Sequence, residues 1–476
     1  MFFYLSFLRP PPVQASPSGS ILITPQVAND LRTEPFPDAQ EIFYSWSFCP
    51  LDQPSTFPAI TKPQKLTVWR QSSAYKEISV PLPPGVREGQ SYRLVLTTHG
   101  QGIPHVINFA SAMIGEKPFP VVSMPIIFSS RKVGGTMLGK QEQIERIYRI
   151  PLNVSENAFL VVKEQTSFDL DKKIWDSGIG LSSWIVNLSN SPSEINESGV
   201  ITRLKEILFS SEPRNYLELG AGTGIVSLTL GALRSSLKAY EEGCIITTDL
   251  DSAMPLLGDN ITTNAALFRT PPSRPQAVTL DWDEVHLPDE VVAVRQGFDL
   301  VMMADVTYNT DSFPSLIRTL SNVVHLHRDP TLPNATPQLP LILLGYKQRD
   351  PAERTLWDMA REYGITFDRV GDVCGAGGEP IEGGLTIYPQ VLLVVTRTIS
   401  RLVDVSVSDI KGHASTEATL FWQQLDHRQE FTDPDIPSWP PSRRADNANP
   451  QVEKDGGMST TAQHEQLASS SGTCEI

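Results

Sequence analysis

Three glycines follow a strand-like run in YLELGAGTGIVSL (216–228), at positions 220, 222 and 224. Glycine lets the backbone turn sharply and approach a ligand without a Cβ atom in the way. The dinucleotide fingerprint GxGxxG seats a pyrophosphate on a helix N-terminus. Here the spacing is GxGxG, and Glu218 precedes the first glycine closely. A carboxylate at that point favours a cationic ligand, one with an ammonium or sulfonium, over a diphosphate. Taken alone, the stretch also fits an ordinary glycine-rich turn.

Two further elements could complete a nucleoside site. Asp249 lies in the strand-like run CIITTDL (244–250), and a carboxylate ending that strand can accept two hydrogen bonds from ribose hydroxyls. Trp282, in LDWDE (280–284), could stack on an adenine ring while a polar neighbour contacts the adenine amino edge. A lone tryptophan is more often a core residue, so Trp282 counts only beside the other two elements. Together the three predict a nucleoside-binding site.

The elements that must position these residues alternate between strands and helices. Nearly continuous apolar runs predict parallel strands buried on both faces, at NYLEL (215–219), CIITTDL (244–250), FDLVMMAD (298–305), LPLILLGY (339–346) and PQVLLVVTR (389–397). Apolar residues at helical spacing predict helices over 225–237, 313–324 and 353–364. This alternation indicates an α/β fold with a doubly wound sheet and right-handed crossovers.

The motifs in combination resemble those of class I S-adenosylmethionine-dependent methyltransferases. More specifically, the chain is similar to family 16 of these enzymes (methyltransferase-like 21 type), the seven-strand protein-lysine methyltransferases that act on Hsp70-type chaperones, an AAA ATPase and translation elongation factors. The resemblance covers roughly residues 145 to 400, and its matching stretches are 161–185, 216–228, 248–264, 280–284, 298–309 and 345–357. It implies a seven-strand, doubly wound, Rossmann-like methyltransferase domain and S-adenosyl-L-methionine as cofactor.

Carried over residue by residue, the resemblance implies a set of cofactor-binding positions: Trp175, Glu218, Gly220, Ala221, Gly222, Gly224, Asp249, Asp281, Trp282 and Ala304. The glycine loop would line the methionine moiety, with Glu218 close to its ammonium group. Asp249 would hold the ribose, and Trp282 with Asp281 would flank the adenine. Trp175 would pack near the cofactor, and Ala304 would lie along it.

Asp305 and Tyr308 match the family's acidic-x-x-Tyr motif at the mouth of the substrate channel, and they are the expected catalytic residues. A lysine must lose a proton before it can attack, because an ammonium group has no lone pair. Asp305 could orient the amine, and the Tyr308 hydroxyl could accept a hydrogen bond from it. A loop-ordering or helix-capping role for Asp305 is the alternative, and bulk water could take the proton.

The composition limits the function classes. The chain has 476 residues with 39 Lys+Arg and 54 Asp+Glu, a net charge of −15. Such an acidic chain is not expected to bind nucleic acid generically. No apolar run approaches the roughly 18 residues of a membrane span. The four cysteines are scattered, so neither a metal site nor a disulfide framework is expected. We expect a cytoplasmic or nuclear monomer that acts on a lysine-bearing protein, without nucleic acid or membrane.

The chain divides by composition into five predicted parts. Residues 1–40 are expected to be a loose segment, and 41–130 a β-rich accessory domain that serves as structural cover or as a substrate-recognition platform. The methyltransferase domain spans 131–400, a helical or irregular extension 401–430, and a polar, disordered tail 431–476. Three alternatives remain: methylation of a histidine, a protein N-terminus or a small amine; a non-catalytic cofactor-binding scaffold; and an NAD-dependent oxidoreductase, which the glycine spacing disfavours.

Overall fold

The computed structural model describes residues 1–49, 60–131, 139–153, 155–167, 169–191, 198–237, 242–294, 296–326, 339–375 and, for the backbone, 391–398. The predicted extension at 401–430 and the predicted tail at 431–476 lie outside these residues. In the described ranges, no helix is long and apolar enough to cross a membrane.

The N-terminal part of the chain is built from strands. One sheet contains β1 (Tyr4–Arg9), β3 (Ile21–Ala28) and β6 (Ile78–Val80). The second contains nine strands: β2 (Gln14–Ala15), β4 (Gln40–Cys49), β5 (Gln64–Trp69), β7 (Ser91–Thr97), β8 (Val106–Asn108), β9 (Val121–Ser123), β10 (Ile126–Phe128), β11 (Gln143–Pro151) and β12 (Asn157–Gln165). Residues from both sheets, among them Leu5, Ile23, Trp46 and Leu94, share one apolar core. We call residues 1–165 the β-rich region.

Two predicted boundaries in this part of the chain are wrong. Residues 1–40 are not loose, because β1 and β3 pair with each other and bury Leu5, Phe7 and Ile21 in the core. The β-rich region does not end at residue 130, because β11 and β12 pair along their whole length and join its nine-stranded sheet. Buried and less buried residues alternate along β12, as in an antiparallel strand with one covered face. Both the β-rich region and the following α/β region belong to one compact unit, Met1–Val403.

The α/β region contains a seven-stranded sheet with the order β15-β14-β13-β16-β17-β19-β18. Its strands are β13 (Asn215–Leu219), β14 (Cys244–Asp249), β15 (Pro275–Thr279), β16 (Leu300–Ala304), β17 (Leu341–Tyr346), β18 (Ile365–Val373) and β19 (Val391–Thr398). The first five strands of that order are parallel. The prediction of a Rossmann-like α/β fold is confirmed. The prediction that 389–397 adds another parallel strand is wrong, since β19 runs antiparallel to both of its neighbours.

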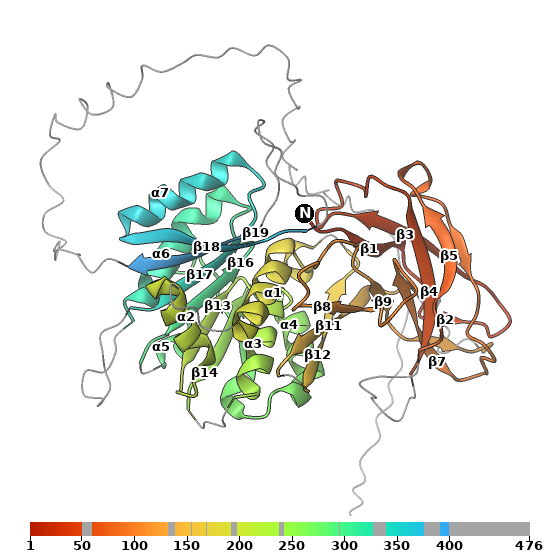
Figure 1. Ribbon diagram of the computed structural model, residues 1–476, viewed down its shortest axis with the longest axis horizontal. Coiled ribbons are helices and arrows are strands. Elements are labelled where there is room, and N and C mark those ends of the chain that lie inside the picture. The colour runs from red at the N-terminus through yellow and green to blue at the C-terminus, as the bar shows by residue number, and fades with distance from the viewer. Residues whose placement is uncertain are drawn as a thin grey trace, which may run out of the picture. The chain divides into compact units, whose positions relative to one another are not determined.

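Helices alternate with the strands and cover both faces of this sheet (Figure 1). They are α1 (Asp176–Asn190), α2 (Gly199–Phe209), α3 (Ile225–Ser235), α4 (Met254–Thr263), α5 (Asp289–Val292), α6 (Phe313–Val324) and α7 (Thr355–Glu362), with short 3-10 turns at Gln71–Ser73, Leu170–Lys172, Ala265–Leu267, Pro271–Ser273, Thr310–Ser312 and Pro351–Arg354. Tyr216 of β13 packs in the same core as Leu228 of α3. Leu217 points to the opposite face and shares a core with Leu316 of α6. Because both faces of β13 are covered, its apolar residues Tyr216, Leu217 and Leu219 lie on both sides of the sheet.

Candidate functional site

A cavity of about 270 Å³ lies at the carboxyl ends of β13, β14 and β16. Strand order reverses between β13 and β16, and ligands of doubly wound sheets bind at such switch points. Eleven of the predicted site residues line the cavity: Trp175, Glu218, Gly220, Ala221, Gly222, Asp249, Asp281, Trp282, Ala304, Asp305 and Tyr308. Gly224 does not line it. The structure thus brings together residues that are up to 133 positions apart, from Trp175 to Tyr308.

The glycine loop between β13 and α3 needs glycine for two different reasons. Gly220, Gly222 and Gly224 have φ values of 65°, 54° and 79°, in the left-handed region that other residues avoid. A Cβ atom on Gly220 would also lie 2.8 Å from Val306 Cγ1 and 3.2 Å from Trp282 Cζ2. Glycine at 220 therefore lets the indole lie directly against the loop. Gly224 instead caps α3, where a Cβ atom would lie 2.5 Å from Leu257 Cδ1.

Asp249, at the end of β14, is held by the backbone around it. The Gly222 N–H donates to Oδ2 at 2.6 Å, and the Leu250 N–H donates to Oδ1 at 2.7 Å. Burial raises the pKa of Asp249. An ionised carboxylate has about four acceptor positions, so each oxygen keeps capacity for one more donor. A pair of vicinal hydroxyl groups suits this arrangement.

Glu218 lies beneath the glycine loop and is only 2% exposed. Its Oε2 accepts hydrogen bonds from the Ser227 N–H and the Thr247 hydroxyl, each at 3.1 Å. Burial raises the pKa of Glu218 to about 7 because a charged carboxylate is costly away from water. A cation placed in the cavity would favour the ionised form.

The residues after β15 form the side wall of the cavity. The half-buried Trp282 lies against Gly220, and its carbonyl accepts a hydrogen bond from Arg318 at 2.7 Å. The exposed Asp281 accepts the Asp283 N–H at 2.9 Å, which orders the turn. Ala304, the last residue of β16, lines the cavity from the sheet edge.

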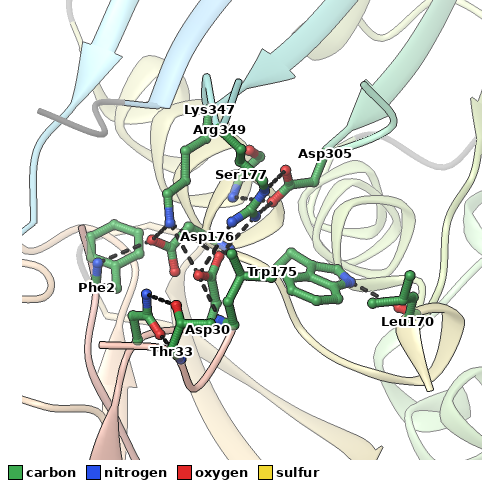
Figure 2. Close-up of polar contacts among 12 residues, drawn as sticks. Phe2, Asp30, Thr33, Leu170, Trp175, Asp176, Ser177, Asp305, Lys347 and Arg349 are labelled. Carbon is green, nitrogen blue, oxygen red and sulfur yellow. Dashed lines mark hydrogen bonds and ion pairs between the residues drawn. The ribbon is translucent and has the colours of Figure 1, made fainter. Parts of the chain in front are cut away.

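Asp305 follows β16 in a left-handed backbone conformation, with φ of 60°. This conformation costs free energy for any residue other than glycine, and residues with such backbone strain cluster at functional sites. Its N–H donates to the Gly345 carbonyl at 3.1 Å. Its carboxylate accepts two hydrogen bonds from Arg349, from Nε to Oδ1 at 3.2 Å and from Nη2 to Oδ2 at 2.6 Å (Figure 2). This bidentate pair fixes the carboxylate at the cavity wall.

Tyr308 lies at the more open part of the cavity and is 57% exposed. Burial of its hydroxyl and the charge of Asp249 raise the pKa of Tyr308, so the phenol stays protonated at neutral pH. The hydroxyl can both donate and accept a hydrogen bond.

Several residues of the site were not predicted from the sequence. Arg349 lies in a family-like segment, 345–357, but nothing in its spacing indicates that it pairs with Asp305. Its guanidinium also lies 5.3 Å from the centre of the Trp175 ring, and the Trp175 Nε1–H donates to the Leu170 carbonyl at 2.9 Å. Leu170, Asp171 and Lys173 add a wall from the lead-in to α1.

The wall of the cavity is acidic. Its charged residues are Asp171, Lys173, Glu218, Asp249, Asp281, Asp283 and Asp305. Six of these seven carry carboxylates, which attract a cationic substrate and disfavour an anionic one. In the part of the chain that the structure describes, no group of three or more His, Cys, Asp or Glu residues could hold a metal ion.

Comparison with known proteins finds a family match and several relatives. The model of a family described as lysine methyltransferase matches residues 154–362. Protein-lysine N-methyltransferase EFM6 of Saccharomyces cerevisiae is 28% identical over 184 residues, 38% of this chain and 68% of that protein. EEF1A lysine methyltransferase 3 of Xenopus tropicalis is 32% identical over 109 residues, 22% of this chain and 40% of that protein. The mouse protein of the same name is 32% identical over 116 residues, 24% of this chain and 42% of that protein.

Solved structures give a weaker likeness. The cofactor-bound protein Rv0187 from MTB aligns with 46% of this chain and 89% of its own, at 12% identity and a TM-score of 0.27. That score is too low to bear on function. The sequence relatives are the informative matches. The chain spans between about two fifths and two thirds of their length.

Proposed function

We propose that this chain, whose residues 154–362 match the lysine methyltransferase family, methylates a lysine of a partner protein with S-adenosylmethionine. The observation that carries the proposal is the single cavity that joins the glycine loop and Asp249 to Asp305 and Tyr308. A nucleoside on one side and an amine on the other would meet there.

The residues present fit the proposed cofactor. Glycine at 220 lets Trp282 and Val306 pack directly against the loop, so that the indole lies at the cavity wall. Asp249 has one acceptor position left on each oxygen, which suits the two ribose hydroxyls. Glu218 would face the ammonium of the methionine moiety. When bound, the cofactor supplies an electrophilic methyl group on a sulfonium, and we assign Trp175, Ala221, Gly222, Asp281, Trp282 and Ala304 to its enclosure. Gly224 supports the loop without lining the cavity.

The acceptor amine would enter beside Asp305 and Tyr308. The reaction forms a bond from the amine nitrogen to the methyl carbon as the bond from sulfur to carbon breaks, with its electron pair remaining on sulfur. Arg349 and the weak Ser177 N–H contact at 3.5 Å use three of the acceptor positions of Asp305, which leaves one for the amine. Asp305 would therefore orient the amine, and Tyr308 would accept its remaining N–H. Holding the nitrogen in line is the main contribution of both side chains.

The acidic cavity wall supports a cationic acceptor, since lysine arrives as an ammonium and loses its proton only before transfer. Two relatives are named for EEF1A lysine methylation. Among chaperones, AAA ATPases and translation factors, we therefore propose a translation factor of the EEF1A kind as the target. We assign the β-rich region, residues 1–165, as an accessory part of the enzyme.

Transfer of labelled methyl groups tests this proposal. The purified full chain is incubated with labelled S-adenosylmethionine and a cell lysate, and in parallel with purified EEF1A. We expect one discrete labelled protein band, with methyl-lysine identified by mass spectrometry, and a much weaker label with the Asp249→Ala variant at a limiting cofactor concentration. Label in small molecules alone would contradict a protein substrate. Methyl-histidine or a methylated N-terminus in the band would keep the cofactor assignment and replace the acceptor.

A further inference from the structure

Five charged side chains from distant parts of the chain meet behind the acceptor end of the cavity (Figure 2). Three are carboxylates and two are cations: Asp30, Asp176, Asp305, Lys347 and Arg349. Asp30 comes from the β-rich region, and the others come from the α/β region. Buried charges persist only when they are paired, because desolvation is costly. The contacts of Asp30 therefore show what the β-rich region contributes at this point.

Asp30 lies in the turn after β3 and is only 4% exposed. Its Oδ2 accepts from Arg349 Nη2 at 2.9 Å, and Lys347 Nζ lies 3.1 Å from Oδ1. Although burial opposes ionisation, Lys347 and Arg349 hold the pKa of Asp30 well below its usual range. Asp30 is thus a fixed anion that faces both cations.

The turn that carries Asp30 is itself ordered. Asn29 Oδ1 accepts the Thr33 N–H at 3.0 Å, and the Leu31 N–H donates to Asp30 Oδ1 at 2.9 Å. The Asn29 N–H donates to the Glu34 carbonyl at 2.9 Å, which closes the turn. Side-chain contacts of this kind pin a turn in one conformation. The Asp30 carboxylate is therefore presented from a defined position.

Arg349 connects this anion to the methyl-transfer site. The Arg349 guanidinium donates a hydrogen bond to Asp30. The same guanidinium donates to Asp305, through Nε at 3.2 Å and through Nη2 at 2.6 Å. The same group lies over the Trp175 ring. Because the guanidinium is planar and rigid, an anion that fixes one edge also sets the direction of the other.

We propose that Asp30 is a positioning residue for methyl transfer, which acts through Arg349 to hold the Asp305 carboxylate in line with the acceptor amine. This inference rests on the proposed function of Asp305. The β-rich region then completes the acceptor side of the site, besides any part it has in binding the substrate.

The test compares Asp30→Asn with a matched variant, Glu145→Gln. Glu145, on β11 of the nine-stranded sheet, is also a carboxylate that is 4% exposed. It forms an ion pair with Arg93 at 3.0 Å. We expect Asp30→Asn to lower kcat for methylation of the labelled protein band about tenfold, since small misalignments of a reacting group are costly. S-adenosylhomocysteine affinity should change less than about twofold. Glu145→Gln should leave kcat unchanged.

A double variant separates positioning from general stability. In an Arg349→Met background, Asp30→Asn should cause no further loss of kcat, because its route to Asp305 is already removed. Losses that multiply in the double variant would overturn the inference, as would equal losses of kcat in Asp30→Asn and Glu145→Gln. If Asp30→Asn does not fold, Asp30→Glu keeps the charge one methylene further out and enters the same cycle.

Hydrogen exchange supplies a readout that does not need the substrate. Asp30→Asn should speed amide exchange in residues 305–309 relative to wild type, and Glu145→Gln should not. Unchanged exchange in 305–309 would overturn the inference even if activity fell. If the wild-type protein labels no protein at all, the proposed function fails, while this exchange comparison still decides whether Asp30 orders the Asp305 loop.

Discussion

The two sides of the cavity are built in different ways. The core of the proposed cofactor side, Glu218, Gly220, Asp249 and Trp282, comes from one stretch of strands and loops, to which Trp175 and Ala304 add walls from outside. The acceptor side, defined by Asp305, Tyr308, Arg349 and Asp30, draws on three separated segments, one of them in the β-rich region. The proposed nucleoside site thus depends mainly on the local geometry of consecutive β–α turns. Aligning an amine needs an assembly of distant parts.

The carboxyl groups of the two sides also differ in their partners. Glu218 and Asp249 accept hydrogen bonds from neutral backbone and hydroxyl donors, and burial raises the pKa of both carboxyls. Asp305 and Asp30 are instead paired with the internal cation Arg349. The cofactor side is thus arranged to gain from an incoming cation. The acceptor side holds its carboxylates in fixed directions before any substrate arrives.

Changing Asp305 should break the acceptor side and leave the cofactor side intact. Asp305→Asn would remove the charge proposed to orient the amine and one partner of Arg349, so we expect kcat to fall about 100-fold, as for misplacement of a reacting group by about 1 Å. S-adenosylhomocysteine affinity should stay within about twofold of wild type. The measurement is steady-state methylation together with calorimetry. A variant that loses cofactor affinity as strongly as kcat would show that the two sides are not separable.

Changing Asp249 should do the reverse. Asp249→Ala would remove the two hydrogen bonds proposed for the ribose, together with the anchor of the Gly222 N–H, so we expect about 30-fold weaker S-adenosylhomocysteine binding, as for hydrogen bonds to a charged group. The matched control is Asp251→Ala, which removes an exposed carboxylate two residues further on. Equal affinities of the two variants in calorimetry would remove the ribose assignment.

The pH dependence of binding sharpens the contrast, because Glu218 titrates near neutrality. Its pKa lies at about 7 rather than the ordinary 4.5, so the folded protein holds this proton more tightly than the unfolded chain. The free energy of unfolding therefore falls as pH rises from 4.5 to about 7. The ligand ammonium favours the ionised carboxylate, so S-adenosylhomocysteine affinity should be about tenfold lower at pH 6 than at pH 8.

Glu218→Gln is the control for this titration, since it cannot ionise and keeps a similar shape. Its affinity should vary little between pH 6 and pH 8. A wild-type profile that is equally flat would show that Glu218 does not face the ammonium group.

The smallest effect is expected at Tyr308. Tyr308→Phe keeps the ring and removes only a hydroxyl in a half-open environment, so kcat should fall about threefold, close to the value of one exposed hydrogen bond. Cofactor affinity should not change. A loss as large as that of Asp305→Asn would make Tyr308 the principal orienting group and would revise the order of the two catalytic residues.

The residues proposed for the cofactor side could be selected from the sequence for a physical reason, and most of them line one cavity. Glycines with left-handed φ values and an acid at a strand end leave local marks, so Gly220, Glu218 and Asp249 were identified from spacing alone. The family resemblance added Trp175 and Asp305. Gly224 was assigned to the cofactor because it shares the glycine spacing, but its conformation serves the cap of α3.

The acceptor side could not be predicted to the same extent. Arg349 and Asp30 are 319 positions apart, and their ion pair depends on where two regions meet. A single aspartate after a strand resembles any turn residue. The same limit explains the errors in the β-rich region, where short antiparallel strands such as β1 gain their partners from long-range pairing and the prolines at 10–12 suggest a loose segment.

A crystal structure of the full chain with S-adenosylhomocysteine tests the central claim most directly. We predict the ribose hydroxyls within hydrogen-bond distance of Asp249, the adenine beside Trp282 and the sulfur directed toward the side where Asp305 and Tyr308 lie. A nucleoside bound outside this cavity, or a sulfur atom separated from Asp305 by protein side chains, would contradict the account.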